Sequence, residues 1–345
     1  MARQSSRRVS SIKKTKGECY ICNGLMYRID ELLELTLLAL EEYSYETFLI
    51  GATLPSYMLE HEDEVRARFK IKGTENVKHY LTKELGKGLT RRTGKKVDYI
   101  KPDVSVNVDI IKNNVIVRSR AIFLFGKYVK RVRGLNQKQE RCNNCKGKGC
   151  SQCNNTGLSG FGSIEGIIVK KLIDAFGCES AKFAWVGGED KESLVLNGGR
   201  PFFVKVINPK LRFARPRIAR KDGVEIRFVK RVGRLPDKPL RFKVKLRLLV
   251  ECECKVGKES IEKINALANT VVRFGGKRGQ EVTRNLYAIS AKASENMLKI
   301  SMVADGGLTI KQFINGDGIT PNISEIVGCK ATCRSFDILS VKFAG

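Results

Sequence analysis

The chain has 345 residues, of which 42% are hydrophobic and 29% are charged, a composition typical of a folded globular protein rather than a disordered one. Lys and Arg number 64 against 36 Asp and Glu, so the formal net charge is +28. This excess of positive charge attracts polyanions and indicates nucleic acid as the first-choice partner, the alternative being a basic, solvated surface with no specific ligand. No apolar run approaches the ~18 residues that span a bilayer, which excludes a membrane-spanning helix.

In chain order, residues 1–16 are basic and polar and lack the apolar core of a signal peptide, so we expect a flexible basic arm on a cytoplasmic protein. The length favours two domains, with three as the alternative. The first, over residues 17–156, is expected to be α+β. Its predicted elements are an amphipathic helix with Leu33, Leu37 and Leu40 on one face, a strand over 46–55, a basic helix over 75–92 and a hairpin turning at Asn113-Asn114.

The second domain, over residues 157–345, is predicted to be α+β and built mainly on antiparallel sheet. Ser163 can cap a helix that runs to Phe176 and stops at Gly177. Apolar and basic residues alternate over 241–252, which predicts a strand with one packed face and one cationic face. Further strands are expected at 285–293, 297–304 and 335–343, with short helices after Gly257 and Gly307.

The chain has eleven cysteines, and six of them form Cys-x-x-Cys pairs, a spacing that favours metal binding over disulfides in a reducing cell. Each pair can offer two thiolates, and a structural zinc needs four. Either the two later pairs form a self-contained site, or one of them joins the first pair. The candidate ligands, four of which would bind zinc, are Cys19, Cys22, Cys142, Cys145, Cys150 and Cys153. The remaining five, predicted to be core residues, are Cys178, Cys252, Cys254, Cys329 and Cys333.

The segment "WVGGEDKESLVLNGGRPFF", residues 185–203, carries the candidate chemistry. Alone, an acidic pair after two glycines is typical of a solvated turn. The spacing from Glu189-Asp190 to Gly199-Arg200-Pro201-Phe202 resembles the signature of the archaeal and eukaryotic tRNA pseudouridine synthases of the Pus-ten family. "FGKYVKRVRGLNQ", "CNNCKGKGCSQCNNTG", "VINPK" and "GGLTIKQFINGDGITP" are similar to other family segments, so the resemblance covers most of the chain from residue 17.

The resemblance implies a zinc-stabilised THUMP-like RNA-binding module followed by a pseudouridine synthase domain. It also implies isomerisation of uridines 54 and/or 55 in the tRNA T-arm, with no catalytic cofactor. Neither a membrane nor an obligate protein partner is expected. Asp190 matches the catalytic aspartate, and Lys311 matches a basic residue expected to face it. A nearby cation would keep the carboxylate ionised, and the target uridine must leave its stack. Arg200 is a second candidate, for orienting the turn or contacting phosphate.

Three positions depart from the family pattern. Gly188 replaces an arginine, Thr309 replaces a tyrosine, and Leu246 aligns with the tyrosine that stacks on the target base and is implicated in proton removal from C5. Tyr287 is either a substitute aromatic ring or a half-buried sheet residue. These departures support an alternative, a tRNA-binding homologue with weak or no catalysis. A zinc-dependent deaminase is disfavoured, because neither of the two histidines belongs to a His-x-Glu ligand set.

Several basic segments are candidates for binding the RNA. The mixture of cations and an aromatic ring just before the cysteine-rich segment suits an RNA surface, and a basic helix could extend it. A glycine-rich loop with Lys277 and Arg278 could grip the T-arm. The residues of the first surface are Lys127, Tyr128, Lys130, Arg131 and Arg133, and those of the helix are Lys83, Lys87, Arg91 and Arg92.

Overall fold

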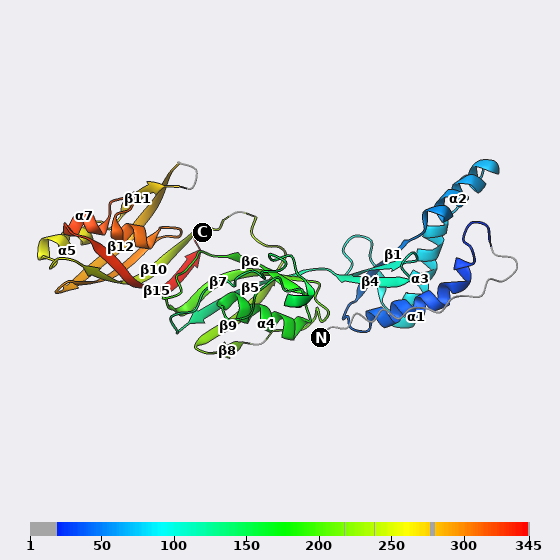
Figure 1. Ribbon diagram of the computed structural model, residues 1–345, viewed down its shortest axis with the longest axis horizontal. Helices are drawn as coiled ribbons and strands as arrows, with labels where there is room; N and C mark the ends of the chain where they lie inside the picture. Colours follow the sequence, from blue (N-terminus) through cyan, green and yellow to red (C-terminus); the bar gives the residue numbers. More distant parts are fainter. Residues whose placement is uncertain (1–18, 217, 238, 277–279, 344–345) are drawn as a thin grey trace. The chain divides into compact units, whose positions relative to one another are not determined.

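The computed structural model describes residues 19–216, 218–237, 239–276 and 280–343 (Figure 1). These residues form two compact units. Unit 1 contains residues up to 122 together with 173–180 and 206–215, and unit 2 contains 123–172, 181–205 and the residues from 216 on. The predicted boundary after residue 156 therefore differs from the observed division, because the strand that begins at Ile122 pairs with a strand of unit 2.

Unit 1 is a mixed four-stranded sheet with helices packed on it. The strand order is β2-β1-β3-β4, in which β1 runs parallel to β2 and β3, while β3 and β4 form the predicted antiparallel hairpin. Asn113 turns the hairpin with a positive φ of 50°. The elements are η1 (Leu25–Arg28), α1 (Ile29–Leu40), β1 (Thr47–Thr53), α2 (Ser56–Arg68), α3 (Val77–Thr93), β2 (Lys96–Val97), β3 (Val104–Asp109) and β4 (Asn114–Ser119).

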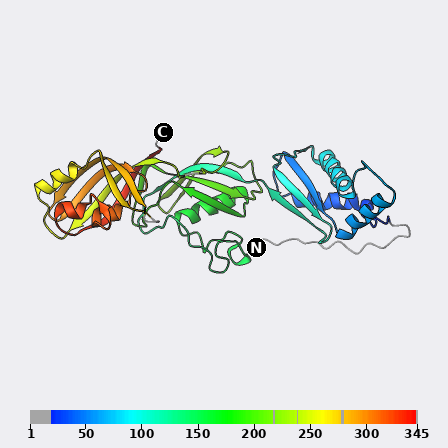
Figure 2. The ribbon, with the colours of Figure 1, turned by 90° about the horizontal axis from the view of Figure 1, so that it is seen from above.

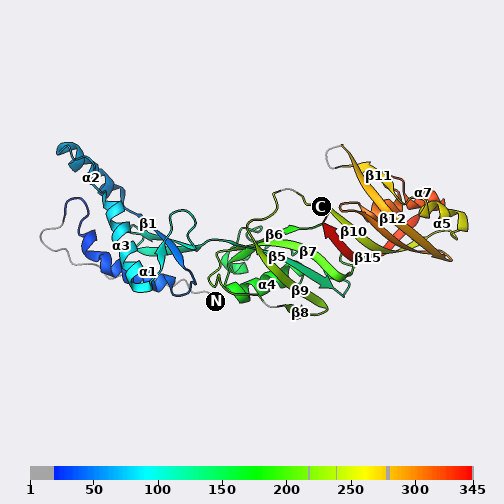
Figure 3. The ribbon, with the colours of Figure 1, turned by 180° about the vertical axis from the view of Figure 1, so that it is seen from behind.

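The core of unit 1 explains its helices. Leu81, Leu85 and Leu89 of α3 recur at helical spacing, and they are buried together with Leu32 and Leu33 of α1. Helix α1 packs against β4 and α3 against β1, and Figure 3 shows both helices beside the sheet. Helix α2 has no such apolar stripe, and the sequence did not predict it. The late segment 206–215 belongs to this unit through an ion pair, in which the Arg212 Nε atom lies 3.1 Å from Asp103 Oδ1.

Unit 2 is built around one long sheet, with the strand order β14-β11-β12-β13-β10-β15-β7-β5-β9-β8 and β6 paired to β7. Most neighbours are antiparallel, as predicted, but β7 and β15 are parallel where Val195 meets Ile338. The elements are β5 (Ile122–Lys130), η2 (Ser151–Cys153), α4 (Ile164–Phe176), β6 (Ser180–Trp185), β7 (Val195–Ile207), β8 (Ala219–Lys221), β9 (Val224–Val232), β10 (Phe242–Cys252), α5 (Lys258–Asn265), β11 (Thr270–Gly275), β12 (Glu281–Ser294), β13 (Met297–Asp305), α6 (Ile310–Asn315), β14 (Ile319–Thr320), α7 (Ile323–Val327) and β15 (Ala331–Phe343).

Strand β10 shows the predicted alternation. Val244, Leu246 and Leu248 are buried, whereas Lys243 and Lys245 between them are exposed. Helices α5, α6 and α7 pack against strands of this part of the sheet (Figures 1 and 2). Ile264, Phe313 and Ile323 of these helices are fully buried. The apolar residues of β10 thus face a helix layer, and the basic residues lie on the opposite face.

The cysteine pattern required one correction. Cys254 and Cys329 were predicted to be core residues, but they form a disulfide between the segment after β10 and the turn before β15. The pair is 75 residues apart in sequence, so no spacing rule could connect them. Within the described part of the chain, no helix has the length and apolarity needed to cross a membrane.

Candidate active site

Asp190 and Lys311 come together in unit 2, at the surface. Lys311 lies in the first turn of α6, and its Nζ atom donates a 2.6 Å hydrogen bond to Asp190 Oδ2. The backbone N–H of Glu192 donates to Asp190 Oδ1 at 3.0 Å. The Lys311 ammonium group, followed by this N–H, holds the pKa of Asp190 below its usual value, and Asp190 in turn raises the pKa of Lys311. The carboxylate is therefore ionised, and its side chain remains 27% exposed.

Glu189, the other member of the acidic pair, points into the protein. Its side chain has no exposed surface and lies between two cations, with Lys130 Nζ at 3.3 Å and Arg200 Nη1 at 3.6 Å. The Tyr128 hydroxyl donates to Glu189 Oε2 at 2.8 Å, and the Gln137 amide donates to that hydroxyl at 2.9 Å. Two cations thus compensate one buried carboxylate, which is the pairing that makes burial of such a charge tolerable.

Lys130 also fixes the backbone beneath Asp190. Its Nζ atom donates to the carbonyl oxygens of Asp190 and Lys191, both at 3.2 Å, and to that of Leu135 at 2.9 Å. Burial lowers the pKa of Lys130, and Glu189 opposes this shift. The sequence did not predict this role, although strand periodicity gave a signal, because Lys130 lies two residues from Tyr128 and so shares its face.

A second anchor holds the other end of the motif. Asp337 of β15 accepts hydrogen bonds from the backbone N–H of Leu194 at 3.1 Å and from Arg133 Nη1 at 2.8 Å. Arg133 also donates to the carbonyl of Glu192. Nothing in the sequence marked Asp337, because its partners come from segments about 140 and 200 residues away. The loop that carries Asp190 is therefore tied to β5, β15 and α6.

The two glycines before the acidic pair have different roles. Gly187 has a φ of +76°, and a Cβ atom there would lie 2.7 Å from the Phe242 ring, so glycine is required. Gly188 lacks a positive φ, and its nearest neighbour, Gln137 Oε1, would be 3.9 Å from a Cβ atom. The position at which the family has arginine therefore has room for a side chain.

No aromatic side chain occupies position 246, where the family pattern has a tyrosine. Leu246 is 2% exposed and sits on β10 between Met302 and Ile338 of the neighbouring strands. Tyr287 lies on the opposite face, because its hydroxyl donates to Asp305 and Lys243 stacks over its ring at 3.6 Å. Tyr287 therefore cannot supply a ring where Leu246 lies. Thr309 immediately precedes α6 as its N-cap residue.

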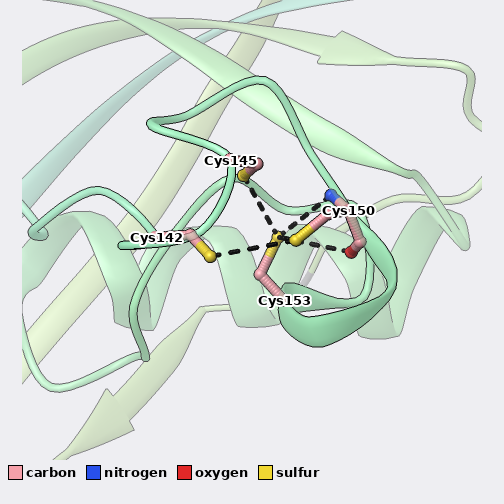
Figure 4. A group of neighbouring side chains, drawn as sticks. All are labelled: Cys142, Cys145, Cys150 and Cys153. Atoms are coloured by element: carbon pink, nitrogen blue, oxygen red, sulfur yellow. Dashed lines mark hydrogen bonds between the residues drawn. The ribbon is translucent and has the colours of Figure 1, made fainter.

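The four later cysteines of the candidate set form one cluster, in the loop between β5 and α4 (Figure 4). All four Sγ atoms lie within 4.8 Å of one another. Three contacts measure 3.9 Å for Cys142–Cys150, 3.8 Å for Cys145–Cys153 and 3.7 Å for Cys150–Cys153. A tetrahedral zinc with bonds of about 2.3 Å requires sulfur separations of about 3.8 Å. The donor set therefore fits zinc, and the self-contained alternative is the one that the geometry favours.

Backbone N–H groups also prepare this cluster for a metal. Gly149 donates to Cys145 Sγ at 3.2 Å, and Cys150 and Gly157 donate to Cys153 Sγ at 3.3 Å. Desolvation raises the pKa of Cys153, but these two N–H groups, together with hydrogen bonds to the side chains of Cys150 and Cys145, outweigh it and lower the pKa to about 6. Cys19 and Cys22 belong to the other unit and are not part of the cluster.

The predicted RNA-contacting residues lie in different environments. Tyr128, Lys130 and Arg200 are at most 3% exposed, so they cannot offer an RNA-binding surface. Of the two roles considered for Arg200, the structure supports orienting the turn, because it donates to the Gly188 carbonyl. Tyr128, Lys130 and Arg200 instead surround the buried Glu189 carboxylate.

The other predicted RNA contacts are closer to the surface. Arg131 and Arg133 are exposed but paired with Glu225 and Asp337, and Lys127 is half-buried. On α3, Lys83, Lys87 and Arg92 pair with Glu75, Glu84 and Glu34. Arg91 is exposed. Lys277 and Arg278 lie outside the described residues.

The described chain thus joins an N-terminal α/β unit to a second unit with a long, mainly antiparallel sheet and an aspartate paired to a lysine. The chain matches the family described as "Pus10, C-terminal" over residues 123–342 and "Pus10 THUMP domain, archaeal" over residues 34–109. The chain therefore belongs to the Pus10 family, and its fold is a THUMP domain followed by the family's C-terminal domain.

Individual relatives agree with this assignment. The tRNA pseudouridine synthase Pus10 of Nitrosopumilus maritimus is 34% identical over 97% of this chain and 88% of its own length. The protein of the same name from Cenarchaeum symbiosum is 34% identical over 93% and 80%. A chain from a solved Cbf5-Nop10-Gar1 complex covers 62% of this chain and 48% of its own with 11% identity and a TM-score of 0.34, a likeness too weak to support a structural argument.

Proposed function

We propose that this protein isomerises uridine 54, uridine 55 or both in the T-arm of tRNA to pseudouridine, with Asp190 as the catalytic carboxylate. The observation that carries the proposal is the Asp190–Lys311 pair at 2.6 Å, at the surface of a Pus10-family domain. The relatives that cover nearly the whole chain are named tRNA pseudouridine synthases, which supports tRNA as the substrate.

The reaction breaks the bond from uracil N1 to C1′ of the ribose and forms a bond from C5 to C1′, while C5 loses a proton and N1 gains one. The reaction is an isomerisation, so its atoms balance without an oxidant or a reductant. An ionised carboxylate can act in it as nucleophile or base. Lys311 maintains that ionisation, and Lys130 fixes the backbone from which the carboxylate projects. The uridine must be flipped out of its stack to reach Asp190.

One observation favours the second candidate, a tRNA-binding homologue with weak or no catalysis. Leu246 stands where the family has its tyrosine and cannot accept the C5 proton, and Tyr287 is on the other face of the sheet. If proton removal needs a phenolic oxygen, turnover will be slow while binding is retained.

The test is chemical mapping of pseudouridine in an unmodified tRNA transcript after incubation with the protein. Asp190→Asn keeps the acceptor for the Glu192 N–H but removes the negative charge, so we expect a folded variant that binds tRNA and forms no product. Glu192→Gln removes a neighbouring carboxylate and serves as the matched control. Product from Asp190→Asn at the wild-type rate would overturn the catalytic assignment, and tRNA binding without product from wild type would establish the second candidate.

We also propose that Cys142, Cys145, Cys150 and Cys153 hold one structural zinc. The sulfur separations and the N–H groups directed at Cys145 and Cys153 support this assignment. The metal would cross-link the loop between β5 and α4. This loop lies next to the turn that carries Asp190, because the Gln137 amide donates to the Gly187 carbonyl, and it is held to α4, because the Gln139 N–H donates to Glu165. Metal analysis of protein prepared without chelators should give about one zinc per chain.

A further inference from the structure

The exposed face of the β12-β13-β10-β15 sheet carries six cations that the active site does not use. They come from four neighbouring strands and are all exposed. We call this set the cation grid. Its members are Lys243, Lys245 and Arg247 on β10, Lys292 on β12, Lys299 on β13 and Lys342 on β15.

The grid contains like charges placed directly opposite each other. Lys243 is in register with Lys342 across β10 and β15, and Lys292 is in register with Lys299 across β12 and β13. Directly opposed like charges destabilise a sheet, and a folded protein normally avoids them. A surface that is merely solvated has no need of two such pairs, so this arrangement indicates a polyanion that neutralises them.

The carboxylates of this face are already engaged. Asp305 accepts from Tyr287 and Asn285, Asp337 is held by Arg133, and Glu251 pairs with Arg334. Among the described residues, no carboxylate forms an ion pair with any member of the grid. Lys243 is in register with Asp305 across β10 and β13, and its ammonium group lies over the Tyr287 ring, at 3.6 Å from the ring centroid. The grid therefore keeps its positive charge available for a ligand.

Small side chains separate the cations. Ser301 and Ser290 face each other beside Arg247, while Ser340 and Val303 flank Lys245, with Ala288 opposite Val303 on the next strand. Alternate residues of a strand lie about 7 Å apart, and neighbouring strands lie about 5 Å apart. The grid therefore presents positive charges both along and across the strands. Serine hydroxyls and lysines are groups that bind phosphate oxygens in nucleic-acid complexes.

The grid adjoins the proposed active site. Arg247 is in register with Asp337, and Asp337 accepts the N–H of Leu194, four residues after Asp190. We infer that the cation grid binds the RNA phosphate backbone beside the nucleotide that reaches Asp190, and so fixes the register of the tRNA on the catalytic unit. This inference rests on the proposed tRNA substrate and adds a binding surface to it.

The experiment compares two triple variants with equal loss of charge. The grid variant is Lys245→Gln, Arg247→Gln and Lys299→Gln. The control replaces three exposed lysines of unit 2 that lie outside the grid, Lys170→Gln, Lys255→Gln and Lys258→Gln. Binding of an unmodified tRNA transcript is measured at several salt concentrations, because each phosphate contact contributes about 0.7–0.9 to the slope of log affinity against log salt.

We expect the grid variant to lose about 2 to 3 from this slope and to bind at least ~10-fold more weakly at low salt, while the control stays close to wild type. The melting temperature of the grid variant should equal or exceed that of wild type, because Lys299→Gln relieves the Lys292–Lys299 repulsion. Equal slopes for the two triple variants, or an unchanged grid variant, would overturn the inference.

The outcomes also separate this inference from the proposed function. Grid-dependent binding by a wild type that forms no pseudouridine would contradict catalysis and leave the grid assignment in place. Pseudouridine formation by wild type, together with an unchanged salt slope in the grid variant, would support catalysis and contradict the grid assignment.

Discussion

Lys311 and Asp190 are 121 residues apart in sequence, yet their charged groups meet at 2.6 Å with the lysine side chain 59% exposed. Exposed pairs contribute little to folding, about 0–1 kcal/mol. The pair therefore serves to keep Asp190 ionised and adds little to the stability of the fold. In this it differs from the ion pair of the preceding residue, Glu189, with Lys130, which is fully buried.

Replacing Lys311 by Met should thus leave the melting temperature nearly unchanged and raise the pKa of Asp190. Because the folded pKa of Asp190 is depressed, its charge is complete above the ordinary aspartate range and is lost only as the pH falls through the lower folded value. We expect Lys311→Met to move the acidic limb of the pH profile for kcat/KM to higher pH, and Lys311→Arg to restore most of the wild-type profile. Identical acidic limbs for wild type and Lys311→Met would contradict this role.

Unlike Lys311→Met, the substitution Lys130→Met should strongly reduce the stability of the fold. It removes one of two cations from a fully buried carboxylate and three hydrogen bonds to backbone carbonyls, so we expect a loss of about 3 kcal/mol in the free energy of unfolding. The control is Lys127→Met on the same strand, where the side chain is half-buried. Thermal unfolding of both variants measures the difference, and equal stabilities would show that Glu189 does not depend on Lys130.

Gly187 and Gly188 offer a comparison within one turn. Gly187→Ala should destabilise the protein by about 1–3 kcal/mol, because alanine is strained at a φ of +76° and its Cβ meets Phe242. Gly188→Arg should fold normally and bind tRNA more tightly, since it restores the family's cation in open space. Denaturant unfolding and tRNA binding give the two readouts, and a Gly188→Arg protein that unfolds more easily than Gly187→Ala would refute the geometric argument.

The cysteine cluster predicts which substitutions release zinc. Cys145→Ser should reduce the zinc content from about one per chain toward zero and lower the melting temperature, because a structural site loses one of four thiolates. Cys19→Ser, which changes the first pair in unit 1, should retain full zinc. Metal analysis of the two purified variants decides the matter, and equal zinc loss in both would favour the alternative in which the first pair supplies ligands.

The sequence predicted much of the fold and the identity of the central pair. The alternation along β10 predicted its two faces, and the family resemblance connected Asp190 with Lys311 across a distance that no local pattern covers. The burial of Tyr128 and Lys130 was missed because basic and aromatic composition was interpreted without the period-two rule that places both on the inner face. Of the two interpretations of Tyr287, the structure agrees with the half-buried sheet residue, which lies at a register shift between Leu286 and Ala288 of β12.

Long-range anchoring of the motif also orders events during synthesis. Unit 1 has all its residues once position 215 has been made, and domains generally fold as they emerge from the ribosome. Asp190 still lacks Lys311 at that stage, and the loop that carries it lacks Asp337. A nascent chain can therefore acquire its THUMP domain well before its carboxylate is held in place, so that domain can meet RNA before Asp190 and Lys311 are paired.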